Sequence, residues 1–357
     1  MEKLYFIVNW GGKAKERAWS GTNYSIYKAL SKMFDIHEIS IKTPWLVTKI
    51  ANKLRLDWFS REWYMSKFRR IENVKSGIVF QFGENLNDTK TRQTYVYQDL
   101  SVSYVKYIRD NLPDVFEVSS FQNAKYSLID KRAESQKKYY NSCSGIFVMG
   151  HWLEKFLISQ GIPNNKVHAV GAGINVKKKL ICPQKKTQSK ILFVGRDFKR
   201  KGGYVTYEAF KILREQGENV ELYVSGPTSN PIENPIDGYH FMGDLDYEQV
   251  ADLYNQCDIF CMPSYFEAYG LVFIEALSYG LPCIGRDCYE MPYFIEDGVT
   301  GKLLKGDDPK MLASLMLSLL HDNQIKQNVL NKQQWYLDNY SWDKVAERME
   351  KIIKSNT

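Results

Sequence analysis

The chain of 357 residues has no long hydrophobic run: no uninterrupted apolar stretch approaches the roughly 20 residues that a membrane-spanning helix needs. Its first residues lack the long apolar region of a secretory signal peptide. The sequence also contains no internal repeat and no low-complexity tract. We therefore expect a cytoplasmic, globular protein that does not cross a membrane and is long enough for two domains of ordinary size.

Cysteine and histidine are scarce, with six and five residues, and neither type has the paired spacing of a metal site. Most of the cysteines lie in apolar, strand-like segments, which is typical of small buried side chains in a reducing cytoplasm. Gly171 and Gly173 do not open a helix with a later acidic partner, so a dinucleotide-binding motif is not supported. The sequence thus predicts no resident metal and no cofactor.

Basic residues are unevenly distributed along the chain. Residues 1–180 hold 29 Lys and Arg against 16 Asp and Glu, whereas residues 181–357 hold 19 against 25. The basic excess indicates an anionic partner for the first half, such as a membrane surface, an acidic polysaccharide or nucleic acid. Nucleic acid is disfavoured because the basic and aromatic residues follow no RNP-like or helix-turn-helix pattern.

The segment 42–70 is the densest in basic and aromatic residues. Its apolar positions 46, 50, 54 and 58 recur at helical spacing, which predicts a helix. Two interpretations stay open. In one, the helix makes a peripheral contact with an anionic membrane, on its inner face, by lying in the headgroup layer. In the other, it packs on its own sheet with its tryptophans in the core.

Short apolar segments alternate with amphipathic ones, which predicts an α/β fold with two doubly wound domains. The strand candidates of the first half are 4–8, 35–41, 77–82, 94–97, 145–149 and 166–170. A helix is predicted over 22–34, capped by Thr22. Residues 175–189 have the composition of a linker, so we expect one domain over 1–180 and a second over 181–340.

Two glutamates of the second half flank the start of an apolar helix. Glu267 follows a buried, strand-like segment, and Glu275 lies about one turn into the helix that Gly270 opens. In open α/β sheets, ligands bind at the carboxyl ends of the strands. The free N–H groups of Gly270, Leu271 and Val272 suit a phosphate, while the two carboxylates accept hydrogen bonds from hydroxyls. This combination indicates a ligand with a sugar on one side of a phosphate and a ribose on the other.

The spacing of Glu267 and Glu275, with seven residues between them, resembles the donor-binding motif of family-4 retaining glycosyltransferases of GT-B fold. A second motif agrees with it: a strand that ends at Gly195 and Arg196, followed by Lys201. The similarity covers nearly all of the second half of the chain and is thinner before it. It implies two Rossmann-like domains that face a central cleft, the first for the acceptor and the second for a nucleotide sugar.

The same resemblance implies a C-terminal helix over 341–357 that crosses back to the first domain, and the activity of a hexosyltransferase. The enzyme would move a hexose from a UDP- or GDP-sugar to a hydroxyl of a glycan or lipid-linked acceptor, in the assembly of bacterial surface polysaccharide or glycoconjugates. The anomeric configuration would be retained by front-face attack, with the departing phosphate as base, so no carboxylate nucleophile of the glycosidase type is assigned.

The resemblance also implies individual roles. Arg196 and Lys201 would stabilise the departing diphosphate, together with Gly195 and the backbone N–H groups at the start of the apolar helix. Glu275 would bind the ribose hydroxyls, and Glu267 the sugar hydroxyls near the reacting carbon.

Three residues of the first half have both a functional and a structural interpretation. Gly11 and Gly12 follow the first strand, where the family has glycines that face the donor diphosphate, but they also fit a simple turn. Asp99 follows another strand and would orient or deprotonate the acceptor hydroxyl. Capping of the next helix explains Asp99 equally well.

Asp244 and Asp246 match the Asp-x-Asp motif that holds a divalent metal in the other major glycosyltransferase fold. Asp246, however, precedes Gln249 at the spacing of a capping box, which is the favoured interpretation. We therefore expect no catalytic metal at this pair.

A rival function is that of a catalytically silent GT-B subunit, which binds the acceptor for another glycosyltransferase or acts as its chaperone. The presence of both glutamates, Arg196 and Lys201 argues against this alternative. The expected partners are thus a nucleotide-sugar donor and a glycan or lipid-linked acceptor, with no nucleic acid.

Overall fold

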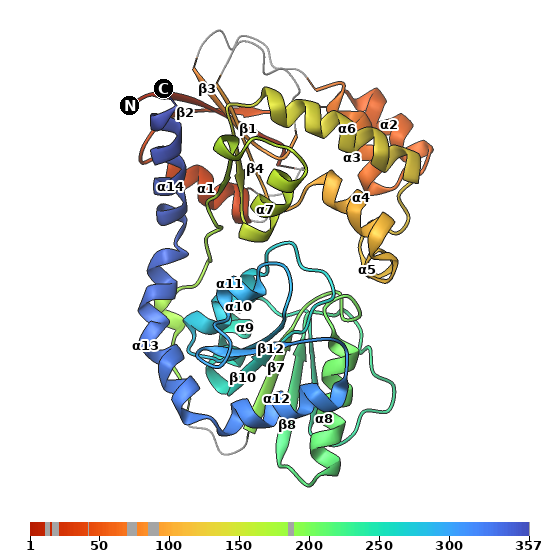
Figure 1. Ribbon diagram of the computed structural model, residues 1–357, viewed down its shortest axis with the longest axis vertical. Helices are drawn as coiled ribbons and strands as arrows, with labels where there is room; N and C mark the ends of the chain where they lie inside the picture. Colours follow the sequence, from red (N-terminus) through yellow and green to blue (C-terminus); the bar gives the residue numbers. More distant parts are fainter. Residues whose placement is uncertain are drawn as a thin grey trace. The chain divides into compact units, whose positions relative to one another are not determined.

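The computed structural model describes residues 1–10, 15, 21–41, 43–69, 77–84, 93–184 and 189–356. The chain divides into two compact units: unit 1 comprises Met1–Gly173 with Ser341–Thr357, and unit 2 comprises Ile174–Tyr340. The boundary between them therefore follows Gly173 rather than residue 180. Each unit contains a parallel six-stranded sheet with helices packed against it (Figure 1).

The sheet of unit 1 has the strand order β2-β1-β3-β4-β5-β6. Its strands are β1 Lys3–Val8, β2 Asp35–Ser40, β3 Ile78–Phe82, β4 Thr94–Gln98, β5 Gly145–Val148 and β6 Val167–Ala169. All six predicted strands of the first half are confirmed to within one residue at either end. The order reverses between β1 and β3, which is the pattern of a doubly wound sheet.

Eight helices of unit 1 lie in the part of the chain that the structure describes. They are α1 Thr22–Leu30, α2 Trp45–Lys53, α3 Trp58–Ser66, α4 Val102–Asn111, α5 Pro113–Val118, α6 Tyr126–Ser142, α7 His151–Ser159 and α14 Trp342–Ser355, with a 3₁₀ turn at Asn164–Lys166. The predicted start of α1 at Thr22 is confirmed, but its predicted cap and its predicted end are wrong. Its N-cap is Gly21, in the left-handed region with φ 83°, rather than Thr22, and the helix ends at Leu30 instead of residue 34.

The segment 42–70 forms two helices instead of the continuous one that its spacing predicts. Arg55 adopts a left-handed φ of 47° after the end of α2, and this conformation cannot continue a helix. Asp57 then begins α3, because its carboxylate accepts a hydrogen bond from the Ser60 amide at 2.9 Å. Lys42 and Arg70, the ends of the segment, lie outside the described residues.

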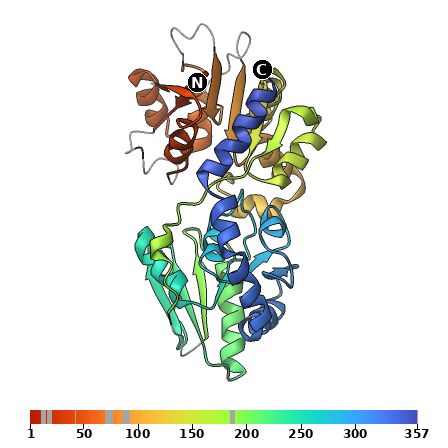
Figure 2. The same cartoon turned by 90° about the vertical axis from the view of Figure 1, so that its left-hand side faces the viewer.

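The C-terminal helix α14 packs along α1 within unit 1 (Figure 2). Its apolar face is fully buried and comprises Val345, Ala346, Met349 and Ile353. At the edge of this contact, Lys32 Nζ forms an ion pair with Asp343 Oδ1 at 2.6 Å. The last helix is therefore part of the core of unit 1 even though it follows unit 2 in the chain.

The sheet of unit 2 has the order β12-β11-β10-β7-β8-β9. Its strands are β7 Ser189–Val194, β8 Val220–Ser225, β9 Tyr239–Gly243, β10 Ile259–Cys261, β11 Cys283–Arg286 and β12 Gly301–Leu304. Its helices are α8 Gly203–Glu215, α9 Tyr247–Gln256, α10 Leu271–Ser278, α11 Met291–Phe294, α12 Pro309–His321 and α13 Asn323–Asn339, with a 3₁₀ turn at Lys178–Leu180. The order reverses between β7 and β10, so the predicted pair of doubly wound α/β domains is confirmed.

The central strands are buried on both faces, as parallel strands between helix layers must be. All three residues of β10 are completely buried, which explains why its apolar run was readable as a strand. Four of the six cysteines are buried and unpaired, in keeping with their apolar surroundings; they are Cys143, Cys257, Cys261 and Cys283. No helix among the described residues is both long enough and apolar enough to span a bilayer.

Candidate active site

The predicted donor residues gather at the reversal point of the unit 2 sheet. Gly195 and Arg196 directly follow β7, and Glu267 lies in the segment between β10 and α10. Since β7 and β10 are neighbours in the sheet, their carboxyl ends open side by side. This edge is where doubly wound sheets bind their ligands.

Lys201 and Glu267 form the most direct contact at this edge. Lys201 Nζ lies 2.7 Å from Glu267 Oε2, and both side chains are only 13% exposed. The stem of Lys201 lies so close to Gly195 that a Cβ there would be 2.3 Å from Lys201 Cδ. Gly195 is therefore required for this lysine to reach Glu267 along the end of β7.

Arg200 is a residue of this site that the sequence prediction missed. Its Nη1 lies 3.8 Å from Glu267 Oε2 and donates to the Phe266 carbonyl at 2.5 Å. Asp197 fixes the guanidinium by accepting from Nε at 3.2 Å. Glu267 thus faces two cations, the Lys201 ammonium and the Arg200 guanidinium. The available signal was the Asp197–Arg200 spacing of three residues directly before Lys201.

Arg196 occupies a different position from Lys201. Its side chain is 80% exposed, and its Nη2 lies 3.5 Å from Asp244 Oδ1. It therefore reaches into solvent at the end of β7, and its ion pair is with Asp244 rather than Glu267.

The start of α10 has no side-chain cap. Gly270 precedes the helix with a left-handed φ of 94°, and its Cα lies so near Glu267 that an added Cβ would be 3.2 Å from Glu267 Cγ. The N–H groups of Leu271 and Val272 lie in the first turn, where an α-helix offers no internal acceptor. The helix start therefore presents positive potential next to the Lys201–Glu267 pair.

Glu275 lies in the second turn of the same helix, half-buried beneath Tyr254. Tyr254 Oη donates to Glu275 Oε2 at a long 3.5 Å. Burial raises the pKa of Glu275 to about 7, and the Tyr254 hydroxyl opposes the rise only weakly. Near neutral pH this carboxyl therefore exists in both protonation states in the free protein.

The predicted capping box at the start of α9 is confirmed. The Asp246 carboxylate accepts a hydrogen bond from the backbone N–H of Gln249 at 2.9 Å. The side-chain oxygen of Gln249 accepts one from the backbone N–H of Asp246 at 3.0 Å. Asp244 instead pairs with Arg196. Among the described residues, no three His, Cys, Asp or Glu side chains are grouped so that they could hold a metal ion.

In unit 1, Asp99 lines a cavity of about 280 Å³ at the carboxyl ends of β3 and β4, here called the Glu84 cavity. Burial raises the pKa of Glu84 to about 7, and the Gln136 amide donates to its carboxyl. Burial also lowers the pKa of Arg132, whose Nε has no hydrogen-bond partner among the described residues. The cavity therefore combines buried polar groups in need of partners with an apolar wall that includes Phe59.

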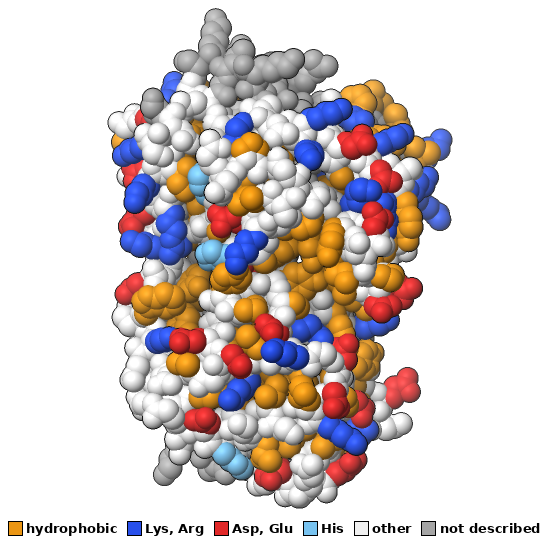
Figure 3. Space-filling model, viewed as in Figure 1, with side chains coloured by type: hydrophobic (Ala, Val, Ile, Leu, Met, Phe, Trp, Pro, Cys, Tyr) orange, Lys and Arg blue, Asp and Glu red, His pale blue; other side chains and the backbone are white. Residues whose placement is uncertain are grey.

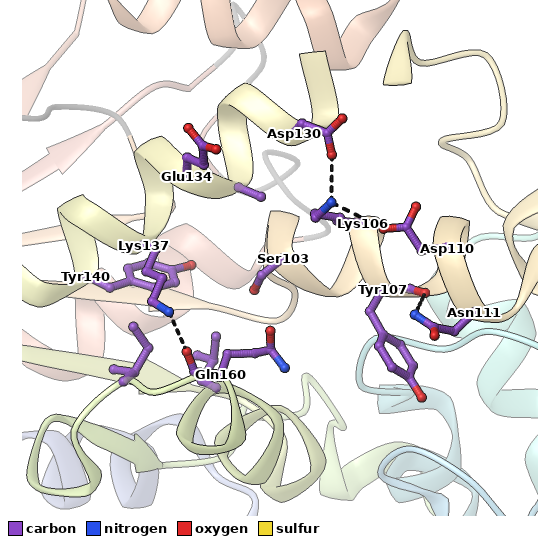
Figure 4. Close-up of a pocket in the computed structure, with 13 residues that line it drawn as sticks. Ser103, Lys106, Tyr107, Asp110, Asn111, Asp130, Glu134, Lys137, Tyr140 and Gln160 are labelled. Carbon is purple, nitrogen blue, oxygen red and sulfur yellow. Dashed lines mark hydrogen bonds and ion pairs between the residues drawn. The ribbon is translucent and has the colours of Figure 1, made fainter. Parts of the chain in front are cut away.

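A second cavity of unit 1, of about 400 Å³, lies between α4 and α6 and contains none of the predicted site residues (Figure 4). Asp130 accepts from Lys106 at 2.9 Å and from Arg109 at 2.8 Å. Arg109 and Lys106 lower the pKa of Asp130 to about 2. The cations of α4 are thus held by a carboxylate of α6, which links the two helices rather than leaving charges for a ligand.

Residues 177–334 match the model of the family described as Glycosyl transferases group 1. Unit 2 is a group 1 glycosyltransferase domain. Gly195, Arg196, Lys201, Glu267 and Glu275 all lie within the matched region of this glycosyltransferase domain. Asp99 lies outside it, and Gly11 and Gly12 lie outside the residues that the structure describes.

Curated relatives match about half of the chain. D-inositol 3-phosphate glycosyltransferase of Corynebacterium kroppenstedtii is 29% identical over 46% of this chain and 40% of its own. Phosphatidyl-myo-inositol mannosyltransferase of Mycobacterium leprae is 24% identical over 51% of this chain and 52% of its own. An uncharacterized 41.2 kDa protein in the cps region of Klebsiella pneumoniae is 27% identical over 48% of this chain and 50% of its own. The chain therefore spans about half the length of these relatives, or less.

Solved structures match the chain over nearly its whole length. Sucrose-phosphate synthase of Thermosynechococcus elongatus superposes with a TM-score of 0.67 at 16% identity, covering 99% of both chains. WaaG, a glycosyltransferase involved in lipopolysaccharide biosynthesis, superposes with a TM-score of 0.62 at 15% identity, covering 98% of this chain and 99% of its own. At such identities the likeness concerns the fold alone, and the fold is the two-domain GT-B fold.

Proposed function

We propose that the protein is a retaining glycosyltransferase that transfers a hexose from a UDP- or GDP-sugar to a hydroxyl of a glycan or lipid-linked acceptor. The observation that carries this proposal is the pairing of Lys201 with Glu267 next to the uncapped start of α10, inside the glycosyltransferase domain. A lysine and free helix amides suit a diphosphate, and a carboxylate suits sugar hydroxyls.

Lys201 can bind the donor while it keeps its contact with Glu267. An ammonium group has three N–H donors, so Lys201 can keep its 2.7 Å contact with Glu267 and still donate to a phosphate oxygen. Arg196, being largely exposed, supplies a planar guanidinium for the same diphosphate. Arg200 holds the Glu267 carboxylate through its charge and so acts as a positioning residue.

In the reaction, the acceptor oxygen forms a bond to the anomeric carbon on the face from which the bond to the phosphate oxygen breaks. The proton of the acceptor hydroxyl passes to the departing phosphate oxygen. Lys201, Arg196 and the amides of Leu271 and Val272 stabilise the negative charge that develops on the diphosphate. These groups carry the stabilisation without a metal ion, and Glu267 orients the hexose through its hydroxyls.

Glu275 binds the ribose hydroxyls in this account. Its pKa of about 7 means that it is partly protonated before the donor arrives. Hydrogen bonds from the two ribose hydroxyls would stabilise the ionised carboxylate and so lower its pKa when the donor binds. Donor affinity should therefore rise with pH through neutrality.

The Glu84 cavity is the candidate for the acceptor side. Asp99 and Glu84 follow adjacent strands of unit 1, and the cavity adds the Arg132 guanidinium and the Phe59 ring. Carboxylates, a guanidinium and an aromatic face are groups that bind sugar rings through hydroxyls and apolar faces. Asp99 would then orient the attacking hydroxyl.

The relatives support an acceptor of this kind and a role in surface glycans. Their names include a phosphatidyl-myo-inositol mannosyltransferase, and the fold matches WaaG of lipopolysaccharide biosynthesis. A further relative is described as a protein in a cps region. We accordingly infer that the product belongs to a bacterial surface polysaccharide or glycoconjugate.

The test is turnover of UDP- and GDP-hexoses with water as a minimal acceptor, followed by NMR of the anomeric proton. Wild type should release UDP or GDP and form a hexose of the donor's own anomeric configuration first, before mutarotation. Lys201→Met, which keeps the aliphatic stem, should abolish release. A product of inverted configuration would refute retention. Binding of a sugar nucleotide without release, with water or glycan acceptors, would instead favour the silent subunit.

A further inference from the structure

The helix α2 turns its apolar residues away from the core of unit 1. Trp45 is 66% exposed, Leu46 55%, Ile50 57% and Leu54, directly after the helix, 63%. Ala51 is the only buried residue of α2. The interpretation in which this helix packs on its own sheet with its tryptophans in the core is therefore wrong for Trp45. The three large side chains of this short helix and Leu54 directly after it form a patch that water solvates poorly.

Cations and aromatic rings alternate around this patch. Lys49 Nζ lies 5.3 Å above the Trp45 ring, and Lys67 Nζ lies 3.6 Å above the Trp63 ring of α3. On the same side of unit 1, Figure 3 shows Lys and Arg side chains interspersed with hydrophobic ones over the region that Figure 1 labels α2 and α3. Rings with an apolar body beside a cation are characteristic of the interface between headgroups and acyl chains.

A basic cavity of about 590 Å³ adjoins the apolar patch, here called the Lys125 cavity. Leu54 belongs to both, since it is exposed and lines the cavity, and the exposed Tyr64 of α3 lines the cavity as well. The charged residues that line the Lys125 cavity are Arg55, Asp57, Lys67, Lys125 and Lys131. Four cations thus face one carboxylate, and that carboxylate already caps α3.

The cations of the Lys125 cavity have no acidic partner in the part of the chain that the structure describes, although Lys67 lies over the Trp63 ring. None of the four lies within 4.0 Å of a described carboxylate, in contrast to the paired cations of the cavity between α4 and α6. Ser127 and Asn123 add a hydroxyl and an amide to the lining. An anion with several acceptor oxygens, such as a phosphate, satisfies such a group of donors.

We propose that α2 and the Lys125 cavity together bind the surface of an anionic phospholipid bilayer. The apolar patch enters the boundary between headgroups and acyl chains, and the phosphate of an anionic headgroup occupies the Lys125 cavity. A bilayer surface offers apolar depth directly beside phosphate charge, which matches an apolar patch and a basic cavity that share Leu54. The proposal does not depend on the transfer reaction, because unit 1 carries every residue involved.

The experiment is co-sedimentation of the full chain with vesicles of phosphatidylcholine alone and with about one third phosphatidylglycerol. Wild type should sediment with the anionic vesicles only, and 1 M salt should release it, because screening then acts within roughly 3 Å. Trp45→Ser with Ile50→Ser should lower the partition coefficient at least tenfold. These positions are exposed, so their thermal unfolding should match wild type.

A matched pair of charge variants tests the cavity. Lys125→Gln with Lys131→Gln should weaken anionic-vesicle binding about 25-fold, at roughly fivefold per cation near a membrane surface. Lys137→Gln with Lys138→Gln removes the same charge from the second half of α6, outside the Lys125 cavity, and should have a much smaller effect. Equal sedimentation with neutral and anionic vesicles, or equal loss in both double variants, would overturn the proposal. Sugar-nucleotide binding should stay unchanged in all three double variants.

Discussion

Glu275 is the residue whose protonation ties folding to donor binding. The pKa of its carboxyl is raised from an ordinary 4.5 to about 7, because this end of the half-buried side chain is desolvated and has only one weak hydrogen bond. When folding raises the pKa of an acid, its protonated form contributes to stability. That contribution is fully present below the unfolded pKa and is lost as pH rises through the folded pKa. The ionised form of Glu275 therefore destabilises unit 2 above pH 7 in the absence of ligand.

The change Glu275→Gln removes this titration while keeping the size of the side chain. The shift from 4.5 to about 7 corresponds to roughly 3 kcal/mol. Between pH 5 and pH 8 the stability of the variant relative to wild type should therefore rise by roughly 2–3 kcal/mol, or about 5–10 °C in Tm. Thermal unfolding of both proteins over this range measures the effect, with the exposed Glu233→Gln as a control on the same unit.

Donor binding should change in the opposite direction. At pH 8 the variant lacks a charged acceptor for the ribose hydroxyls, so its affinity for the sugar nucleotide should fall roughly 10- to 100-fold. Calorimetry at pH 6 and pH 8 completes the assay, since only wild type should bind more tightly at the higher pH. An identical pH dependence of Tm in wild type and Glu275→Gln would refute the burial argument. Unchanged affinity would refute the ribose assignment.

Three further outcomes are expected. Asp246→Ala should lower the Tm of unit 2 by losing a cap that contributes about 1 kcal/mol, without changing sugar-nucleotide affinity in calorimetry. Gly202→Ala should destabilise the protein by more than about 1 kcal/mol in denaturant unfolding, because the residue has φ 77° and its Cβ would be 2.4 Å from the Pro263 carbonyl oxygen. Release of UDP or GDP should persist after exhaustive EDTA treatment, since Lys201 and Arg196 supply the positive charge; complete loss that manganese or magnesium restores would show that a metal is required.

The strands and the capping box were predictable because local chemistry determines them. Buried parallel strands need continuous apolar residues. The bounds of the six strands of the first half were therefore predicted to within one residue. The Asp246 cap depends on a spacing of three residues and nothing more distant. Helix ends were harder to predict, because the left-handed backbone at Arg55 stops a helix that hydrophobic spacing would extend.

Contacts between distant segments were not predictable from one sequence. Lys201 and Glu267 are 66 residues apart, and only the adjacency of β7 and β10 brings them within 2.7 Å. Arg200 was not predicted, because its contact with Glu267 depends on the same adjacency of β7 and β10. Glu84, by contrast, could have been found: it follows β3 as Asp99 follows β4, and the rule that selected Asp99 applies equally to it. Its raised pKa depends on burial, which no sequence pattern reports.

The central claim is that a nucleotide sugar binds at Lys201 beside the start of α10. Thermal unfolding of wild type with a panel of UDP- and GDP-hexoses tests it most directly, because a ligand bound by the folded state raises Tm by mass action. Lys201→Met should lose the shift, whereas Lys211→Met, which removes a surface lysine of α8 paired with Glu208, should keep it. A shift of equal size in both variants, or no shift in wild type with any member of the panel, would contradict the account.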